Sequence, residues 1–332
     1  MSTARQIIAL LKSHIEGEEQ QFFSVAMQVA AHEARQGHVK VAHEIRDLID
    51  QAKQSQSSGL ERKSAPIPLI QPKGELATLL AARYSEMRLN DMVLDPNLRG
   101  RLERVINENV NQRRLEEYNL TPRRKLLLVG PPGSGKSMTA EVLAGELQLP
   151  LLTVLYDSLI TKFMGETASQ LRLIFDAMSI TRGIYFFDEF DAIGSQRGNN
   201  NDVGEIRRVL SSCLQFLEND RSPSLIIAAT NHPELLDKAL FRRFDDVIEY
   251  ELPTFTVIQT LIKTRIVNFK GSWTDWDSIL KVAEGLSQAE IVRATEDAVK
   301  TIVLSEQTII SEEVLIESLT ERKNATFRRI RY

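Results

Sequence analysis

The stretch Gly130–Ser137, which reads Gly-Pro-Pro-Gly-Ser-Gly-Lys-Ser, decides the fold of this chain. It matches the pattern Gly-x4-Gly-Lys-Ser/Thr, which holds phosphate groups when it lies between a β-strand and an α-helix. Both neighbours fit, because the apolar run Lys125–Val129 precedes it and a helical pattern over Ser137–Leu147 follows it. The stretch therefore predicts a phosphate-binding loop inside an α/β domain.

Each residue type in this loop has a physical task. The glycines let backbone N–H groups turn toward phosphate oxygens, and the N-terminus of the following helix adds partial positive charge. Lys136 is expected to reach the β and γ phosphates, and the Ser137 hydroxyl is expected to ligate Mg²⁺. A purely structural turn would not need the Lys-Ser pair at this spacing. We therefore expect ATP and Mg²⁺ as cofactors, with nucleotide contacts from Pro131, Pro132, Gly133, Ser134, Gly135, Lys136, Ser137 and Met138.

A second motif places two carboxylates at the end of a buried strand. The apolar run Ile184–Phe187 is followed by Asp188 and Glu189. The carboxyl edge of a parallel sheet is where a bound nucleotide lies. We expect Asp188 to hold the Mg²⁺ shell and Glu189 to orient or deprotonate the attacking water. A strand-end turn with solvated acids is the alternative, and the phosphate-binding loop upstream argues against it.

The rest of the chain alternates strand and helix patterns before becoming helical. Strand-like runs separated by helical segments indicate a parallel sheet covered on both faces, and they occur at Leu151–Val154, Leu225–Ala229 and Val247–Tyr250. Helices of this core are expected at Pro96–Asn111 and Thr167–Met178. After Pro253 the strand signals stop. The helical segments that follow predict a small lid and lie at Val257–Phe269, Asp277–Ala283, Gln288–Ser305 and Ser311–Leu319.

These patterns divide the chain into four parts. Residues 1–52 show helical periodicity, which predicts a small all-helical unit. Our hypothesis is that this unit serves as a recruitment domain. Residues 53–74 are rich in serine and proline and predict a linker. Residues 75–252 form the expected P-loop α/β core. Residues 253–332 form the helical lid and a basic C-terminal tail.

Composition narrows the classes of partner. The 332 residues carry a formal net charge of −4, with 42% hydrophobic and 26% charged residues, as in ordinary globular proteins. The acidic balance disfavours nucleic acid and anionic membranes as partners. One cysteine, Cys213, excludes an internal disulfide. No apolar run has the length of a signal peptide or a membrane span, so we expect a cytoplasmic protein without membrane contact.

With both motifs in place, the sequence resembles the AAA family of ATPases, in the branch of katanin, spastin, proteasomal ATPases and membrane-anchored AAA proteases. The resemblance covers about Asn90 to Leu319. It implies that Asn231 positions water near the γ-phosphate, although an asparagine after a strand is by itself an ordinary turn residue. It also implies that Arg242 and Arg243 are arginine fingers that reach the nucleotide of a neighbouring subunit.

Two further segments enter through the same resemblance. Lys162, Phe163 and Met164 look like a pore loop whose aromatic residue grips an extended polypeptide, and a core phenylalanine under a loop is the alternative. The motif around Gly285–Glu290 resembles the lid segment that closes over adenine, with Ala289 as a contact. Gln288 stands there in place of the family's glycine.

The resemblance implies a homo-oligomeric ring, a hexamer, that hydrolyses ATP to unfold, thread or remodel protein substrates. Delivery of substrates to a separately encoded protease or effector is a further expectation. The alternative is an ATP-dependent regulatory switch or assembly module that does not thread. Nucleic-acid remodelling is supported only by the basic tail, and a solvated tail is the simpler explanation because the whole chain is acidic. The basic residues of this tail are Arg322, Lys323, Arg328, Arg329 and Arg331.

Overall fold

A computed structural model describes residues 71–159, 164–191, 203–271, 273 and 275–330, together with Val25, Ala26, Val29 and Ala30. The chain divides into two compact units, Met1–Leu69 and Ile70–Tyr332. The predicted helical unit at 1–52 and most of the predicted linker at 53–74 lie outside the described residues. The four N-terminal residues that are described are helical, and Ala26 and Ala30 are buried.

The second unit is built on a six-stranded sheet with the order β1-β3-β4-β5-β2-β6. Five of its strands run parallel, which confirms the predicted α/β class. They are β2 (Lys125–Val129), β3 (Leu151–Val154), β4 (Ile184–Phe187), β5 (Leu225–Thr230) and β6 (Asp246–Glu249). Strands β2, β4 and β5 are buried along their whole length, because helices cover both faces of the sheet.

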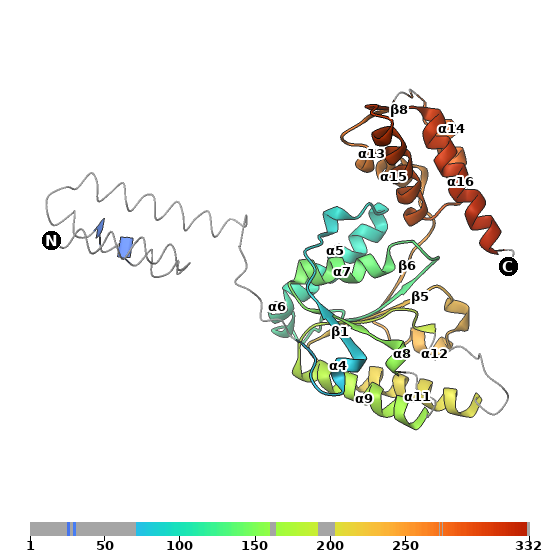
Figure 1. Ribbon diagram of the computed structural model, residues 1–332. Coiled ribbons are helices and arrows are strands. Elements are labelled where there is room, and N and C mark those ends of the chain that lie inside the picture. Colours follow the sequence, from blue (N-terminus) through green and yellow to red (C-terminus); the bar gives the residue numbers. More distant parts are fainter. Residues whose placement is uncertain are drawn as a thin grey trace. The chain divides into compact units, whose positions relative to one another are not determined.

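Helices cover the two faces in pairs (Figure 1). Helices α5 (Pro96–Val110) and α7 (Lys136–Leu147) pack on one face, where Leu126, Leu128 and Phe186 point. Helices α9 (Met164–Ile180) and α11 (Val203–Asn219) pack on the other, where alternate residues such as Leu127 and Phe187 point. Short helices complete the core: α4 (Leu76–Leu79), α6 (Gln112–Glu116), α8 (Tyr156–Leu159), α12 (Lys238–Phe241) and the 3-10 turns η1 (Leu89–Asp91) and η2 (Pro233–Leu235).

The sheet has an antiparallel edge strand that the sequence did not predict. Strand β1 (Leu80–Arg83) pairs with β3, and Leu80 lies opposite Val154. The Leu155 N–H also donates to the Leu79 carbonyl at 2.9 Å. Leu79 and Leu80 are 1% and 3% exposed, so burial of these two side chains explains why the segment returns to the core. A four-residue strand directly after a helical turn gives too short a pattern to detect.

The lid consists of α13 (Phe255–Arg265), α14 (Asp277–Ala283), α15 (Gln288–Leu304) and α16 (Glu312–Ile330), packed around their own apolar core. The prediction that strands stop after Pro253 was wrong. The lid contains a two-residue parallel pair, β7 (Lys270–Gly271) with β8 (Ile309–Ile310). Pairs this short carry no detectable alternation of apolar and polar residues.

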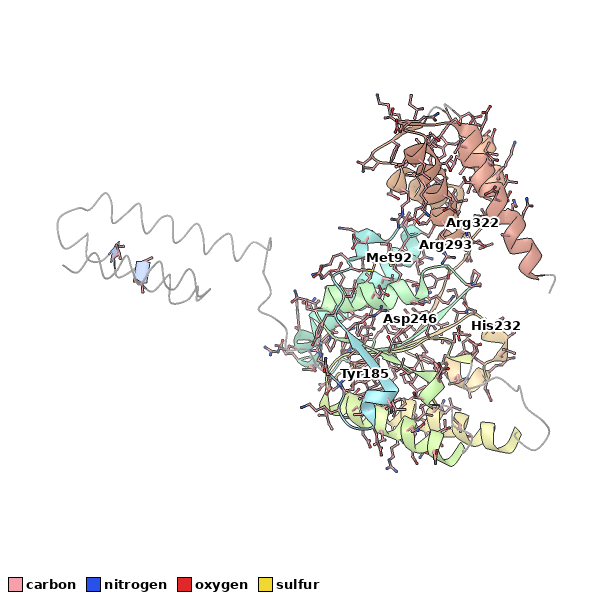
Figure 2. The ribbon with its side chains drawn as sticks, in the orientation of Figure 1. Met92, Tyr185, His232, Asp246, Arg293 and Arg322 are labelled. Atoms are coloured by element: carbon pink, nitrogen blue, oxygen red, sulfur yellow. The ribbon has the colours of Figure 1, made fainter. Side chains whose placement is uncertain are left out.

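The basic tail also differs from the prediction, because helix α16 continues well past Leu319. Arg322, labelled in Figure 2, forms an ion pair with Asp297. Lys323 donates to the carbonyl oxygens of Val282 (3.1 Å) and Glu284 (2.9 Å). The first two basic residues of the tail therefore belong to the lid rather than to a solvated tail. Among the described residues, no helix combines the length and apolar character that crossing a membrane requires.

Candidate functional site

The phosphate-binding loop has the backbone shape that the motif predicts. Gly130 has φ 152° and Gly133 has φ 75°, in the region that favours glycine. Space is the second constraint, since a Cβ atom on Gly130 would lie 2.3 Å from the Tyr250 carbonyl oxygen. A Cβ on Gly133 would lie 2.7 Å from the Ser287 hydroxyl oxygen of the lid. A side chain at Gly130 would collide with the Tyr250 backbone, and one at Gly133 would collide with side chains of the lid.

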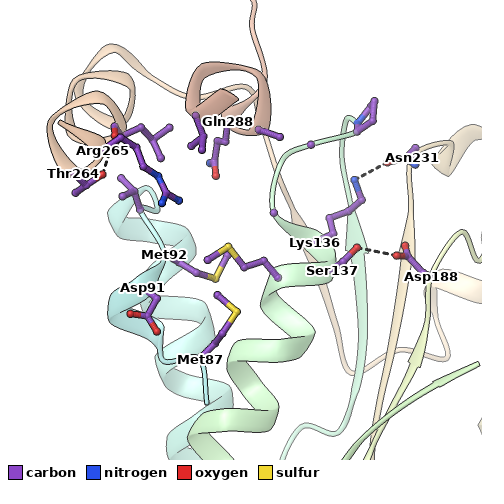
Figure 3. A pocket seen from close by; sticks show the side chains of 18 of the residues that line it. Met87, Asp91, Met92, Lys136, Ser137, Asp188, Asn231, Thr264, Arg265 and Gln288 are labelled. Carbon is purple, nitrogen blue, oxygen red and sulfur yellow. Dashed lines mark hydrogen bonds between the residues drawn. The ribbon is translucent and has the colours of Figure 1, made fainter. Parts of the chain in front are cut away.

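Lys136 lies at the first turn of α7 with its ammonium group held inside the loop. Its Nζ donates to the carbonyl oxygens of Gly130 (2.7 Å) and Pro131 (2.8 Å). It also donates to Asn231 Oδ1 at 2.7 Å (Figure 3). Burial lowers the pKa of Lys136, and the charges of Asp188 and Asp191 oppose that shift. An anionic phosphate oxygen is a stronger acceptor than these neutral groups. The lysine is therefore poised to exchange them for a phosphate.

Ser137 and Asp188 meet across the end of the sheet. The Ser137 hydroxyl donates to Asp188 Oδ2 at 2.8 Å (Figure 3). A hydroxyl and a carboxylate are oxygen ligands of the kind that Mg²⁺ takes, with its other positions filled by water and phosphate oxygens. The two side chains lie in one cleft beside Lys136. This pair fits a magnesium ion bound together with a nucleotide.

The turn after β4 carries the second carboxylate. Glu189 has φ 51°, an uncommon left-handed conformation for a residue with a side chain, and its N–H donates to Asp188 Oδ1 at 3.0 Å. Two bonds fix the turn to β5: Phe190 N–H donates to the Ala229 carbonyl (2.8 Å), and Thr230 Oγ1 donates to Asp191 Oδ1 (2.7 Å). The Glu189 residue is exposed at the cleft. Strained residues of this kind cluster at functional sites.

These groups line a cleft of about 800 Å³ between the core and the lid. The lid is joined to the loop directly, because the Ala289 N–H donates to the Gly133 carbonyl at 3.0 Å. The predicted residues that line the cleft are Pro132, Gly133, Gly135, Lys136, Ser137, Met138, Asp188, Glu189, Asn231 and Ala289. Of the other two loop residues, Pro131 turns its carbonyl to Lys136 and Ser134 is buried beneath the loop.

Sequence reasoning missed the far end of the cleft. The segment before α5, the last turns of α13 and the N-terminal part of α15 supply residues there; they are Met87, Asn90, Asp91, Met92, Val93, Leu261, Thr264, Arg265 and Val292. Figure 3 shows Thr264, Arg265 and Gln288 on the lid helices, facing the segment that carries Met92. No local motif marks these residues. They meet only because the lid folds over the core, and the one available signal was Gln288 in place of a glycine.

The two predicted arginine fingers lie outside the cleft of their own chain, and they differ from each other. Arg242 follows α12 and is exposed, and its backbone N–H donates to the Leu240 carbonyl. Its side chain has no hydrogen-bond or ion-pair partner in the described part of the chain. Arg243 instead forms an ion pair with Glu218 of α11, with Nη2 and Oε2 3.0 Å apart. The sequence treated the pair as equivalent, and the structure separates them.

The predicted pore loop falls largely outside the described residues. Lys162 and Phe163 are not described, and Met164 is described only as the first residue of α9. Among the described residues, no cluster of three or more His, Cys, Asp or Glu side chains could bind a metal by itself.

The glycine loop, its lysine and the two carboxylates at the strand end together define a P-loop nucleotide-hydrolysing domain. Residues 126–252 match the family model described as "ATPase family associated with various cellular activities (AAA)". An uncharacterized AAA family ATPase, y4kL, of Sinorhizobium fredii is 31% identical over 299 residues, which span 89% of this chain and 88% of that protein. The chain belongs to the AAA family and is an ATPase.

Other relatives cover less of this protein. The proteasome-activating nucleotidase of Pyrococcus horikoshii is 32% identical over 211 residues, or 61% of this chain and 53% of that protein. The chain thus spans about half the length of that nucleotidase. Among solved structures, the AAA domain of FIGL-1 superimposes with a TM-score of 0.59 at 19% identity, over 77% of this chain and 91% of that one. This last likeness shows the fold alone.

Proposed function

We propose that the protein is the subunit of a homo-oligomeric ring, a hexamer, that uses ATP hydrolysis to unfold, thread or remodel protein substrates. The observation that carries this proposal is the position of Arg242. Its side chain is exposed, has no hydrogen-bond or ion-pair partner in the described part of the chain, and lies outside the cleft of its own chain. The only basic residues that line the described cleft are Lys136 and Arg265. An arginine from a second copy would complete the site.

Each group at the phosphate end has a task in hydrolysis. Lys136 and the loop N–H groups would hold the β and γ phosphates and stabilise their charge as it develops. Glu189 would accept a proton from the attacking water, and Asn231 would orient that water. When bound by Ser137 and Asp188, Mg²⁺ would neutralise phosphate charge. Arg242 of the neighbouring copy would stabilise the transition state, a contribution of about 10³ to 10⁵ in rate.

The assignment of a protein substrate rests on the predicted loop at Lys162, Phe163 and Met164 and on membership of the AAA family. The relative named a proteasome-activating nucleotidase favours the same assignment, since its name links such an ATPase to proteolysis. We propose that Phe163 grips extended polypeptide through its apolar ring area. The N-terminal unit would recruit substrate, and a separately encoded protease or effector would receive it.

A complementation experiment tests the ring. Glu189→Gln removes the base but keeps Arg242, whereas Arg242→Ala keeps an intact cleft but lacks the arginine for its neighbour. Each variant alone should be inactive, and mixed rings should regain ATPase activity because the first variant supplies Arg242 to the second. Failure of the mixture to regain activity, with rings confirmed by mass in ATP, would contradict hydrolysis across the subunit boundary.

Two controls sharpen this test. Arg243→Ala and Glu218→Gln remove the same ion pair from opposite sides, so both should cause a similar, much smaller loss of ATPase activity than Arg242→Ala.

Phe163→Ala then distinguishes the motor from the regulatory switch. A motor should lose substrate unfolding and keep ATPase activity, while an intact cellular function after this substitution would favour a switch that does not thread.

A further inference from the structure

The arginine segment is anchored at several points around Arg242. Leu240 is fully buried and Phe244 is 8% exposed, so both side chains hold the segment in the core. Asp245 Oδ2 accepts the backbone N–H groups of Arg124 and Lys125 at 2.9 Å each, which ties the segment to the start of β2. Arg243 is bound to Glu218. Arg242 is therefore the unbound member of a segment whose neighbours are all held.

One of these anchors leads directly to the catalytic turn. Phe244 packs edge-to-face on Phe190, with ring centroids 6.0 Å apart and planes at 85°. Phe190 packs in the same way on Phe187, again at 6.0 Å and 85°. Phe187 precedes Asp188 in the chain, and Phe190 follows Glu189. The rings of Phe187, Phe190 and Phe244 thus form a continuous line of contacts. It runs from the turn that carries the two carboxylates to the residue that follows Arg243 in the chain.

We propose that the contact between Phe190 and Phe244 couples the state of a protomer's own cleft to the position of the Arg242 that it presents to the next protomer. Phe190 and Phe244 are positioning residues in this scheme, since neither touches the nucleotide. The proposal rests on the proposed function, because it needs Arg242 to act on a neighbour. It goes further by naming the contacts within one chain that would link its own cleft to the cleft of the next protomer.

Packing explains why the contact transmits movement. Phe190 is 2% exposed and Phe187 is 1% exposed, and close-packed interiors pass displacements on rather than absorbing them. Edge-to-face pairs also fix the relative orientation of the two rings. The turn at Glu189 has the left-handed backbone conformation, so its geometry depends on the contacts around it. Any change in the turn on losing the γ-phosphate would rotate Phe190 against Phe244.

The same core offers a matched control. Phe175 contacts Phe187 with centroids 6.3 Å apart and Phe216 with centroids 5.4 Å apart, which places it among α9 and α11. It belongs to the same apolar cluster as Phe190 and Phe244 but makes no ring contact with the arginine segment among the described aromatic pairs. Phe175→Leu therefore removes a comparable aromatic contact without interrupting the path.

The test measures how one subunit that cannot hydrolyse ATP affects the ATPase activity of its neighbours. Full-length rings are assembled from mixtures of active chains and Glu189→Gln chains, which keep ATP and still supply Arg242. In wild-type background, ATPase activity should fall more steeply than the fraction of active chains. With Phe190→Leu or Phe244→Leu on every chain, the fall should become proportional, while the rate of all-active rings stays within about threefold of wild type. Phe175→Leu should keep the steep curve.

Three results would overturn the proposal: a proportional fall already in wild type, a steep curve retained by Phe190→Leu and Phe244→Leu, or an equally flattened curve in Phe175→Leu. Phe190→Met serves as a second variant of similar volume if Phe190→Leu does not fold, as judged by thermal unfolding. Failure of the proposed function is seen separately, because Glu189→Gln and Arg242→Ala chains would then fail to restore each other's activity. Restored activity with an unaltered steep curve would reject the coupling alone.

Discussion

The two ends of the nucleotide cleft are built in different ways. At the phosphate end, side chains of the core already bind one another, as Lys136 binds Asn231 and Ser137 binds Asp188. At the lid end, Arg265 reaches only a 4.0 Å ion pair with Glu296, and Gln288 makes no side-chain hydrogen bond within the described residues. From this difference we expect the core to fix the chemistry and the lid to adjust how tightly a nucleotide is held.

The largest expected effect comes from comparing the two basic side chains that line the cleft, Lys136 and Arg265. Lys136→Ala should lower kcat/KM for ATP by on the order of 10³-fold, because it removes the charge that faces the phosphates. Arg265→Ala should raise KM by about 2- to 10-fold, as for the loss of one exposed polar contact, and leave kcat unchanged. Steady-state ATPase rates measure both. A loss of kcat in Arg265→Ala equal to that in Lys136→Ala would remove the distinction between the two ends.

A smaller effect is expected at the junction of loop and lid. The Gln288 side chain lies near the loop, because a Cβ on Gly135 would lie 3.7 Å from its Oε1 atom. Gln288→Gly should change the dissociation constant for ATP by a few fold and weaken α15 at its first residue by no more than about 1 kcal/mol, the cost of glycine in a helix interior. Titration calorimetry and thermal unfolding test this prediction. Gln288→Ala is the control, since it removes the amide but keeps the helix propensity, and it should reproduce only the change in affinity.

The smallest effect concerns the core behind the phosphate end. Cys213 is buried in α11, and burial raises its pKa from 9.0 to about 12. The thiolate is the reactive form, so iodoacetamide should label the folded protein very slowly at pH 8, at the same rate with and without ATP. Labelling that accelerates when ATP is added would show that the core also moves.

The same thiol gives a direction for stability against pH. Because its folded pKa is raised, the unfolded chain loses this proton first as the pH increases. The contribution of Cys213 to stability is therefore complete below about pH 9 and is lost as the pH rises toward 12. Cys213→Ala should show a shallower decline over this range in chemical unfolding experiments. An unchanged slope would mean that other groups dominate alkaline unfolding.

Much of the fold follows from local pattern. Strands β2, β3 and β4 have the bounds that their apolar runs predicted. Strands β2 and β4 are fully buried and are followed by Gly130 and Asp188, and β3 begins directly after Pro150. Strand β1 could not be found in this way, since Leu79 and Leu80 become strand neighbours of β3 only through tertiary packing. The extension of α16 was missed for a similar reason, as contacts of Arg322 and Lys323 with other lid helices stabilise it.

The candidate site divides along the same line. Lys136, Ser137, Asp188 and Glu189, which line one cleft, could be predicted because phosphate chemistry imposes fixed residue types at fixed spacing. Arg265 and Thr264 carry no such constraint, since many side chains can line the far end of a cleft. The separate environments of Arg242 and Arg243 were also invisible, because the partner of Arg243 is Glu218, 25 residues earlier in the chain.

The antiparallel pairing of β1 sets a practical limit on how this protein can be shortened. The family match begins at residue 126, which invites a fragment that starts shortly before it. Such a fragment would leave the backbone of β3 as an open edge and would uncover the pocket filled by Leu79 and Leu80. Open edges recruit strands from other chains and cause aggregation. A soluble ATPase fragment must therefore begin no later than Gly74, ahead of α4, so that β1 still pairs with β3 at the edge of the sheet.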